Sequence, residues 1–394
     1  VGCAVPHLKT APMTPDQAPK PARRHLERPS KEQIKLLPPF DALPRQHIHV
    51  LRTPEDFAFA LAQLRNEPFI GFDTESKPCF TSDAPRTGPH VLQFATREQA
   101  FIVQLNNDPP LDFLRMLAFL RKRSLPGIEL IGEDSYQRLL GTPERPTLLR
   151  VTADPKRPEL RLQLGAVDPR LIPDIVRRVR RVFDLDADLQ QVHAALGEEP
   201  LLARGIAERP GLRVPGGWDG FEVGVRAVLG QQVSVAAATT FARRLVDAYG
   251  AHLPGMPSEF NRQFPAPEVL AEAPLESIGL PRSRAATVRA LAAACASGQL
   301  DFGPGQALEE FVARCVALPG IGPWTAQYIA LRGLGQPDAF PAGDLVLQQV
   351  LGHAQGQRLS ERATEARSQP WRPWRAYAVL HLWHLSGTFV GEPT

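Results

Sequence analysis

The sequence predicts an α+β protein of several domains that is mainly helical in its C-terminal half. Its 394 residues are enough for two or three domains, and the 43% of hydrophobic residues suffice for well-filled cores. Short alternating runs between turn residues, typical of strands, recur up to about residue 164, whereas helical spacing of apolar residues prevails from about residue 216. The 40 prolines are about twice the usual share of roughly 5%, which favours short elements with sharp ends.

The composition limits which partners the protein can have and which roles its cysteines can play. The net charge of +3 and the pI of about 8.8 are mildly basic, so they permit a polyanionic partner without requiring one. No run of about 18 apolar residues and no signal peptide are present, so we expect a cytoplasmic protein with no membrane partner. The cysteines lie far apart and match no disulfide or metal-binding spacing: Cys3, Cys79, Cys295 and Cys315.

Residues 1–46 are rich in Pro, Lys, Arg and Gln with little periodicity, which is typical of a disordered leader. The pattern then changes to that of an αβ fragment over residues 47–106. Asp73 and Glu75, two residues apart near the end of a buried strand, project from the same side of it and could share a divalent metal. We expect strands at 47–51, 69–74, 91–95 and 100–104 and a helix at 53–65.

Residues 107–200 are predicted to form a small antiparallel α+β domain, because alternating runs separated by turn residues follow one another. A helix that follows the strands carries four arginines, which we expect on a solvated face. The predicted helices are 112–123 and 173–183, and the predicted strands are 127–131, 136–140, 148–152 and 160–164.

Residues 201–394 are predicted to form a helical region that is almost wholly helical from Gly216 onward. Asp219 is a candidate N-cap for a helix that ends at Gly230, and Ser234 caps the next helix. The interruption places Gln231 and Gln232 on a tight loop between two helices. Two interpretations stay open: the two amides contact a partner, or they cap the helix ends.

Further along the chain, a predicted hairpin between two helices has no side chains to cover its backbone at the glycines. A helical run ends at Pro319 and Gly320, and Pro323 suits the first position of the next helix, 325–334. The glycines leave backbone N–H groups uncovered beside a helix N-terminus, where a nucleic-acid phosphate can approach aligned donors and the positive end of the helix dipole. An ordinary interhelical turn is the other interpretation.

Asp344 precedes an apolar helix, so it is either a catalytic carboxylate or an N-cap, and it can be both. Trp324 and Tyr328 are one helical turn apart and share a face, and Trp383 lies on the last helix. These rings line either a binding pocket or the hydrophobic core.

The hairpin Leu318-Pro-Gly-Ile-Gly-Pro-Trp324 followed by Phe340-Pro-Ala-Gly-Asp344 resembles the signature of the helix-hairpin-helix/GPD superfamily of base-excision DNA glycosylases. The segments around Gly230-Gln-Gln-Val-Ser and residues 371–383 are similar to its 3-methyladenine DNA glycosylase II branch, the AlkA type. The similarity covers roughly residues 109–391. It implies helical helix-hairpin-helix catalytic domains preceded by the small α+β domain.

The N-terminal fragment has a resemblance of its own. Phe72-Asp-Thr-Glu75 followed by Gly88-Pro-His-Val-Leu-Gln-Phe-Ala is similar to the opening of DnaQ-like, RNase D-like 3′-5′ exonucleases. This implies an incomplete RNase H-like α/β fragment, since the later exonuclease motifs have no room. In that family Asp73 and Glu75 would belong to a two-metal site, of which the other acids are missing here.

The glycosylase resemblance implies excision of N-alkylated purines such as 3-methyladenine from double-stranded DNA, in base-excision repair at the bacterial nucleoid, by a monomer that needs no cofactor. It assigns catalysis to Asp344 and the base pocket to Trp324, Tyr328 and Trp383. A cationic base is already a good leaving group, so one carboxylate suffices without a general acid. The implied DNA contacts are Gln231, Gln232, Leu318, Gly320, Ile321, Gly322 and Thr325, and the implied ligands of a structural monovalent cation are the carbonyls of Val316, Leu318 and Ile321.

Relatives often carry an apolar wedge where this chain has Gln232. No lysine follows Lys156, so the catalytic region lacks a side chain for a Schiff base, and we expect no strand cleavage. Two other functions stay open: a damaged-DNA binder without catalysis, and a metal-dependent 3′-5′ exonuclease that uses Asp73 and Glu75.

Overall fold

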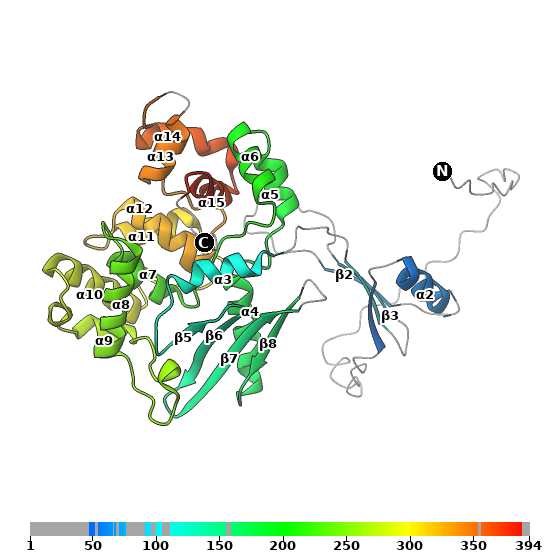
Figure 1. Cartoon of the computed structure of the whole chain (residues 1–394), viewed down its shortest axis with the longest axis horizontal. Helices are drawn as coiled ribbons and strands as arrows, with labels where there is room; N and C mark the ends of the chain where they lie inside the picture. The colour runs from blue at the N-terminus through cyan, green and yellow to red at the C-terminus, as the bar shows by residue number, and fades with distance from the viewer. Residues whose placement is uncertain are drawn as a thin grey trace, which may run out of the picture.

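The computed structural model describes most of the chain from residue 47 onward (Figure 1). The described residues are 47–51, 54–65, 67, 71–75, 91–95, 100–104, 111–154, 159–353 and 356–387. The predicted leader, residues 1–46, lies outside them. Among the described residues no helix is long and apolar enough to cross a membrane.

The N-terminal fragment is a four-stranded mixed sheet with one helix. Its elements are β1 (Ile48–Leu51), α2 (Pro54–Leu64), β2 (Gly71–Glu75), β3 (Val91–Ala95) and β4 (Ala100–Gln104). The order is β1-β4-β3-β2, with β1 parallel to β4 and the other pairs antiparallel. The predicted strands and helix are confirmed here. Asp73 and Glu75 lie in β2 opposite Gln93 and Val91, and their side chains are not among those described.

The next unit is the predicted antiparallel sheet flanked by two helices. Its elements are α3 (Phe113–Arg121), β5 (Glu129–Ile131), β6 (Ser135–Thr142), β7 (Arg145–Ala153), β8 (Leu160–Leu164) and α4 (Ile172–Val182), and the sheet order is β5-β6-β7-β8. Asp112 accepts the Arg115 N–H and so begins α3. Phe113 and Leu117 of α3 and Phe183, just after α4, share one core with the inward side chains of β6 and β7.

The arginines of α4 are only partly on a solvated face. Arg177 and Arg180 are exposed and pair with neighbouring acids, Asp174 and Asp186. Arg178 also pairs with Asp174, at 2.8 Å, but both Arg178 and Arg181 donate to the Trp218 carbonyl, at 3.2 and 2.8 Å. The inner two arginines therefore connect the α+β unit to the chain that leads into the helical part.

The helical part surrounds one large hydrophobic core. That core includes Ala187, Leu189 and Leu196, so α5 packs with the helical part although it precedes the predicted boundary at residue 200. Figure 1 shows α5 and α6 beside α15. The helices are α5 (Leu189–Leu196), α6 (Pro200–Glu208), α7 (Gly220–Leu229), α8 (Val235–Tyr249), α9 (Pro267–Glu272), α10 (Arg282–Ala296), α11 (Leu308–Val316), α12 (Pro323–Ile329), α13 (Leu345–Gly352), α14 (Glu361–Ser368) and α15 (Arg375–Leu385).

Helix α12 does not end at Ile329 but widens into one turn of π-helix, Ala330–Leu334, before Gly335 terminates it at a φ of +70°. The predicted helix 325–334 is thus present with an irregular last turn. Such π-bulges are frequent at functional sites. Here the bulge carries Arg332, which is 7% exposed, into the interior.

Candidate active site

Both helices that flank the loop at residues 230–234, α7 and α8, begin at the predicted N-caps. The Asp219 carboxylate accepts the Glu222 N–H at the start of α7, and the Ser234 hydroxyl accepts the Ala237 N–H at the start of α8. Gln232, between the helices, is exposed and has a φ of +56°, in the left-handed region that a non-glycine residue seldom adopts. The loop therefore presents one amide side chain at its tip from a constrained backbone.

Gln231 has a different position from its neighbour. Its Nε2 donates to the Gly320 carbonyl at 3.0 Å and to the Thr325 hydroxyl at 3.1 Å, while Arg284 Nη2 donates to the Gln231 carbonyl at 2.7 Å. Thr325 is 4% exposed. Gln231 thus joins the loop to the hairpin, and the buried Thr325 hydroxyl is engaged in the same contact.

The hairpin connects α11 to α12 as predicted. Gly320 has a φ of +82°, and a Cβ there would lie 2.0 Å from the Thr287 Oγ1, so both backbone and space demand glycine. Gly320 and Gly322 are exposed, Leu318 is half-buried, and Ile321 is 3% exposed within the helical core. Ile321 anchors the turn while the two glycines leave the backbone uncovered on its outer side.

The carbonyls predicted to hold a monovalent cation lie at this turn. Val316 ends α11, and the Leu318 carbonyl accepts the Ile321 N–H at 3.2 Å. The cation site stays a prediction.

Asp344 is both an N-cap and the neighbour of two tryptophans. Its Oδ1 accepts the N–H groups of Val346 at 3.0 Å and Leu347 at 3.1 Å, which begins α13. Trp324 Nε1 donates to Oδ2 at 3.0 Å, and Trp383 Nε1 donates to Oδ1 at 3.2 Å. The carboxylate is 9% exposed, and no basic side chain of the described residues forms an ion pair with it. Four N–H donors therefore hold the acid at the wall of a cavity.

The predicted aromatic residues line that same cavity, which has a volume of about 360 Å³. The rings of Trp324 and Tyr328 are stacked, with centroids 5.3 Å apart and planes 12° apart, and Trp383 completes the aromatic lining next to Asp344. The structure thus brings together the acid and all three rings that were proposed from the sequence.

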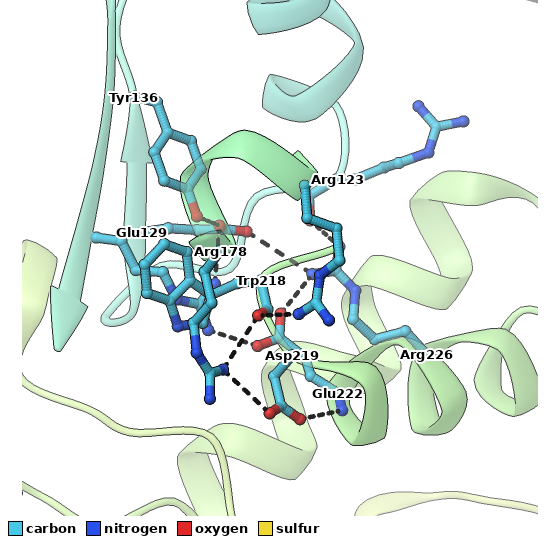
Figure 2. Close-up of polar contacts among 10 residues, drawn as sticks. Arg123, Glu129, Tyr136, Arg178, Trp218, Asp219, Glu222 and Arg226 are labelled. Carbon is cyan, nitrogen blue, oxygen red and sulfur yellow. Dashed lines mark hydrogen bonds and ion pairs between the residues drawn. The ribbon is translucent and has the colours of Figure 1, made fainter. Parts of the chain in front are cut away.

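A group of charged residues in the cavity wall was not found by sequence reasoning (Figure 2). Arg138 of β6 donates to Glu129 of β5 at 3.1 Å and also to Glu222 of α7, and Arg226 pairs with Glu222 at 3.0 Å. Trp218 lies beside this network, with the Arg138 guanidinium 5.6 Å from its ring centroid. The two acids and two arginines come from β5, β6 and α7, so no local spacing in the sequence indicates that they lie together.

Burial and pairing set the charges of this network. Burial raises the pKa of Glu129, in spite of Arg138 nearby. For Glu222 burial also acts to raise the pKa, but Arg138 and Arg226 outweigh it and hold the pKa below its ordinary value. At the join between the α+β unit and α7, the two arginines therefore favour the ionised form of Glu222, whereas burial favours the protonated form of Glu129.

Comparison with known proteins matches two families along the chain. Residues 102–219 match the AlkA N-terminal domain, and residues 225–376 match the HhH-GPD superfamily base excision DNA repair proteins. The chain is 37% identical over 289 residues to DNA-3-methyladenine glycosylase 2 of Escherichia coli, covering 72% of this chain and 97% of that protein.

A Mycobacterium tuberculosis protein named probable bifunctional transcriptional activator/DNA repair enzyme AlkA is 39% identical over 274 residues, which is 70% of this chain. The chain spans about half, 55%, of that relative's length. In fold, it is similar to a 3-methyladenine DNA-glycosylase from Archaeoglobus fulgidus, with a TM-score of 0.61, 19% identity and coverage of 71% of this chain and 97% of that one. From the match over nearly the whole length of the E. coli protein, this chain belongs to the AlkA-type 3-methyladenine DNA glycosylase II family of the HhH-GPD superfamily.

Proposed function

We propose that the protein is a monofunctional DNA glycosylase that excises N-alkylated, cationic purines such as 3-methyladenine from double-stranded DNA and leaves an abasic site for base-excision repair. One observation carries the proposal. The Asp344 carboxylate lies at a cavity whose other walls include Trp324, Tyr328 and Trp383, and two of these rings donate to it directly. The E. coli relative, a DNA-3-methyladenine glycosylase, supports the same substrate class.

The cavity supplies what hydrolysis of a cationic nucleotide needs. Electron-rich rings attract an electron-poor cationic base, by about 0.5 to 2 kcal/mol per ring. As the bond between sugar and base breaks, positive charge develops on the sugar, and an acid fixed by four N–H donors stabilises it without first having to reorient. Asp344 also orients the attacking water and accepts its proton. Because the base leaves without added charge, no general acid is needed.

The loop and the hairpin are proposed to act on the duplex as one unit. The base must leave the stack to reach the cavity. Gln232 is the exposed side chain of the loop, so it is placed to fill the vacated space, and the uncovered hairpin backbone at Gly320 and Gly322 is placed to bind phosphate. Gln231 is better described as a positioning residue, because its amide connects these two DNA-contacting segments.

We infer that the enzyme neither forms an imine nor cleaves the strand, because no lysine follows Lys156. It is proposed to act as a monomer without a cofactor. The resemblance of residues 47–106 to DnaQ-like exonucleases stays a prediction, and Asp73 and Glu75 are its candidate metal ligands.

The test is incubation of the protein with alkylated duplex DNA in EDTA, followed by chromatography of released bases and gel analysis of the strands. Free methylpurine with an intact backbone is the expected result. No base release with retained binding would identify a damaged-DNA binder. Strand cleavage without alkali would contradict the monofunctional mechanism, and nucleotide release that requires Mg²⁺ or Mn²⁺ and is lost in Asp73→Ala would identify an exonuclease.

A further inference from the structure

Arg332 carries a buried guanidinium group that the proposed mechanism does not use. It lies in the π-turn at the end of α12 and is 7% exposed. Its Nε donates to the Pro215 carbonyl, and its Nη1 donates to the Tyr328 hydroxyl oxygen at 3.1 Å. Among the residues that the structure describes, the groups that act on its charge are Tyr328 and Arg226, and no carboxylate is one of them. One side chain therefore joins a ring of the base pocket to the segment that precedes α7.

The segment before α7, residues 215–218, is held from two sides. On one side, the Gly217 N–H donates to the Arg332 carbonyl at 2.8 Å, which satisfies one of the last carbonyls of the widened helix. On the other side lies the α+β unit, where Arg181 of α4 donates to the Trp218 carbonyl at 2.8 Å. Through this segment, the α+β unit is therefore connected to Arg332.

On the pocket side, contacts continue from Arg332 to the proposed catalytic acid, Asp344. The Tyr328 ring stacks on Trp324 with centroids 5.3 Å apart, and Trp324 Nε1 donates to Asp344 at 3.0 Å. Stacking fixes the plane of the Tyr328 ring but allows the ring to slide within that plane. The directional bond from Arg332 to the hydroxyl oxygen restricts this sliding. Arg332 thus determines where Tyr328 lies and, through Trp324, supports the position of Asp344.

The residue type suits both contacts. A guanidinium group has donors at separate positions of a rigid plane, so Nε and Nη1 reach acceptors in two different segments, whereas the ammonium of a lysine is a single point. The Phe119 ring packs against this plane, with Arg332 Cζ 4.8 Å from its centroid. Burial acts to raise the pKa of Tyr328, but Arg332, Arg123 and Arg226 outweigh it and lower the pKa below its ordinary value. The bond between Arg332 and the phenol is thus charge-assisted, and its loss should be measurable.

We propose that Arg332 is a positioning residue for base release, which ties Tyr328 to residues 215–218 so that the α+β unit holds the base pocket in its working arrangement. This rests on the proposed function, and it assigns the α+β unit a part in the reaction. Arg332 acts through Tyr328 and not on the base itself. Its loss should therefore slow base release without weakening the binding of the duplex, which is proposed to contact the loop and the hairpin.

The test is a double-mutant cycle on single-turnover release of methylated base from alkylated duplex at saturating enzyme. Arg332→Met and Tyr328→Phe should each release base about tenfold more slowly, because each removes the same charge-assisted hydrogen bond. The double variant should be no slower than either single variant, since the bond can be lost only once. The dissociation constant for duplex with an abasic site should equal that of the wild type in all three.

A further variant tests the part assigned to the α+β unit. Replacement of Arg178 and Arg181 together by Met detaches residues 215–218 from α4, because both side chains donate to the Trp218 carbonyl. Base release should then be about threefold slower, again with unchanged binding of the abasic duplex. A wild-type rate in this variant would overturn the role of the α+β unit.

Arg213→Met is the matched control, since Arg213 is a buried arginine, 8% exposed, that donates to the Asp184 carbonyl at 2.8 Å outside the cavity. It should lower stability in urea denaturation as Arg332→Met does, yet release base at the wild-type rate. A wild-type rate in Arg332→Met, a double variant about a hundredfold slower, or equal slowing in Arg213→Met would overturn the inference and leave the glycosylase proposal intact. Failure of the wild type to release base, with strands intact, would overturn the proposed function and the inference with it.

Discussion

Replacement of Asp344 by asparagine separates the two roles of this side chain. Asparagine is as good an N-cap as aspartate, so Oδ1 keeps its bonds to Val346 and Leu347. It also keeps the bond from Trp383. The new amide group replaces Oδ2 and faces Trp324 Nε1, so a donor meets a donor where a 3.0 Å bond was. The variant therefore loses one hydrogen bond of the fold, that from Trp324, and the active site loses its negative charge.

The two losses differ in size. The unpaired donors should lower the free energy of unfolding by about 1 to 3 kcal/mol. Loss of the carboxylate removes stabilisation of the positive sugar, which we expect to slow base release by at least about 100- to 1000-fold, by analogy with the loss of a group aimed at transition-state charge. A stable but inactive variant is the expected outcome.

The assay is single-turnover release of methylated base from alkylated duplex, together with urea denaturation of the same preparation. Asp188→Asn is the matched control, because Asp188 caps α5 through the Gln191 N–H and is not part of the cavity. It should release base at the wild-type rate. If Asp344→Asn, folded and capped, kept a rate within about threefold of wild type, the assignment of catalysis to this carboxylate would be refuted.

Three further predictions follow from contacts elsewhere. Burial raises the pKa of Asp184 to about 6 from 3.8, so the folded state keeps a proton that the unfolded state releases, and the free energy of unfolding falls as pH rises from about 4 to about 6. Asp184→Asn should therefore make the protein more stable at pH 8 but not at pH 4, as measured by urea denaturation. The expected gain at pH 8 is about 1 to 2 kcal/mol, because Asp184 is partly exposed and solvent reduces the effect of its charge. Equal gains at both pH values would contradict this. Gln231→Ala should weaken binding to duplex with an abasic site about 3- to 10-fold and speed amide hydrogen exchange in residues 230–234, and no change in either would show that the contact to the hairpin is dispensable. Glu222→Gln should lower the free energy of unfolding by about 3 kcal/mol because Arg138 loses a buried partner, and a loss below about 0.5 kcal/mol in chemical denaturation would contradict that.

Local interactions made much of the helical part predictable. Asp219, Ser234 and Asp344 were recognised as caps because an N-cap bonds an amide two or three residues away, which is visible in sequence. The shared face of Trp324 and Tyr328 follows from the helical repeat alone, and the hairpin follows from glycine and proline at its two ends.

Contacts between distant segments were not predictable in this way. Gln231 bonds residues 89 and 94 positions away, and its identical neighbour Gln232 stays exposed, so residue type could not assign their different roles. Arg138 meets Glu222 across 84 residues, and Arg332 enters the interior because α12 widens into a π-turn. The catalytic candidates were therefore encoded locally, whereas the charge of their cavity arises from packing between domains, because buried side chains pair according to the fold and not according to their spacing along the chain.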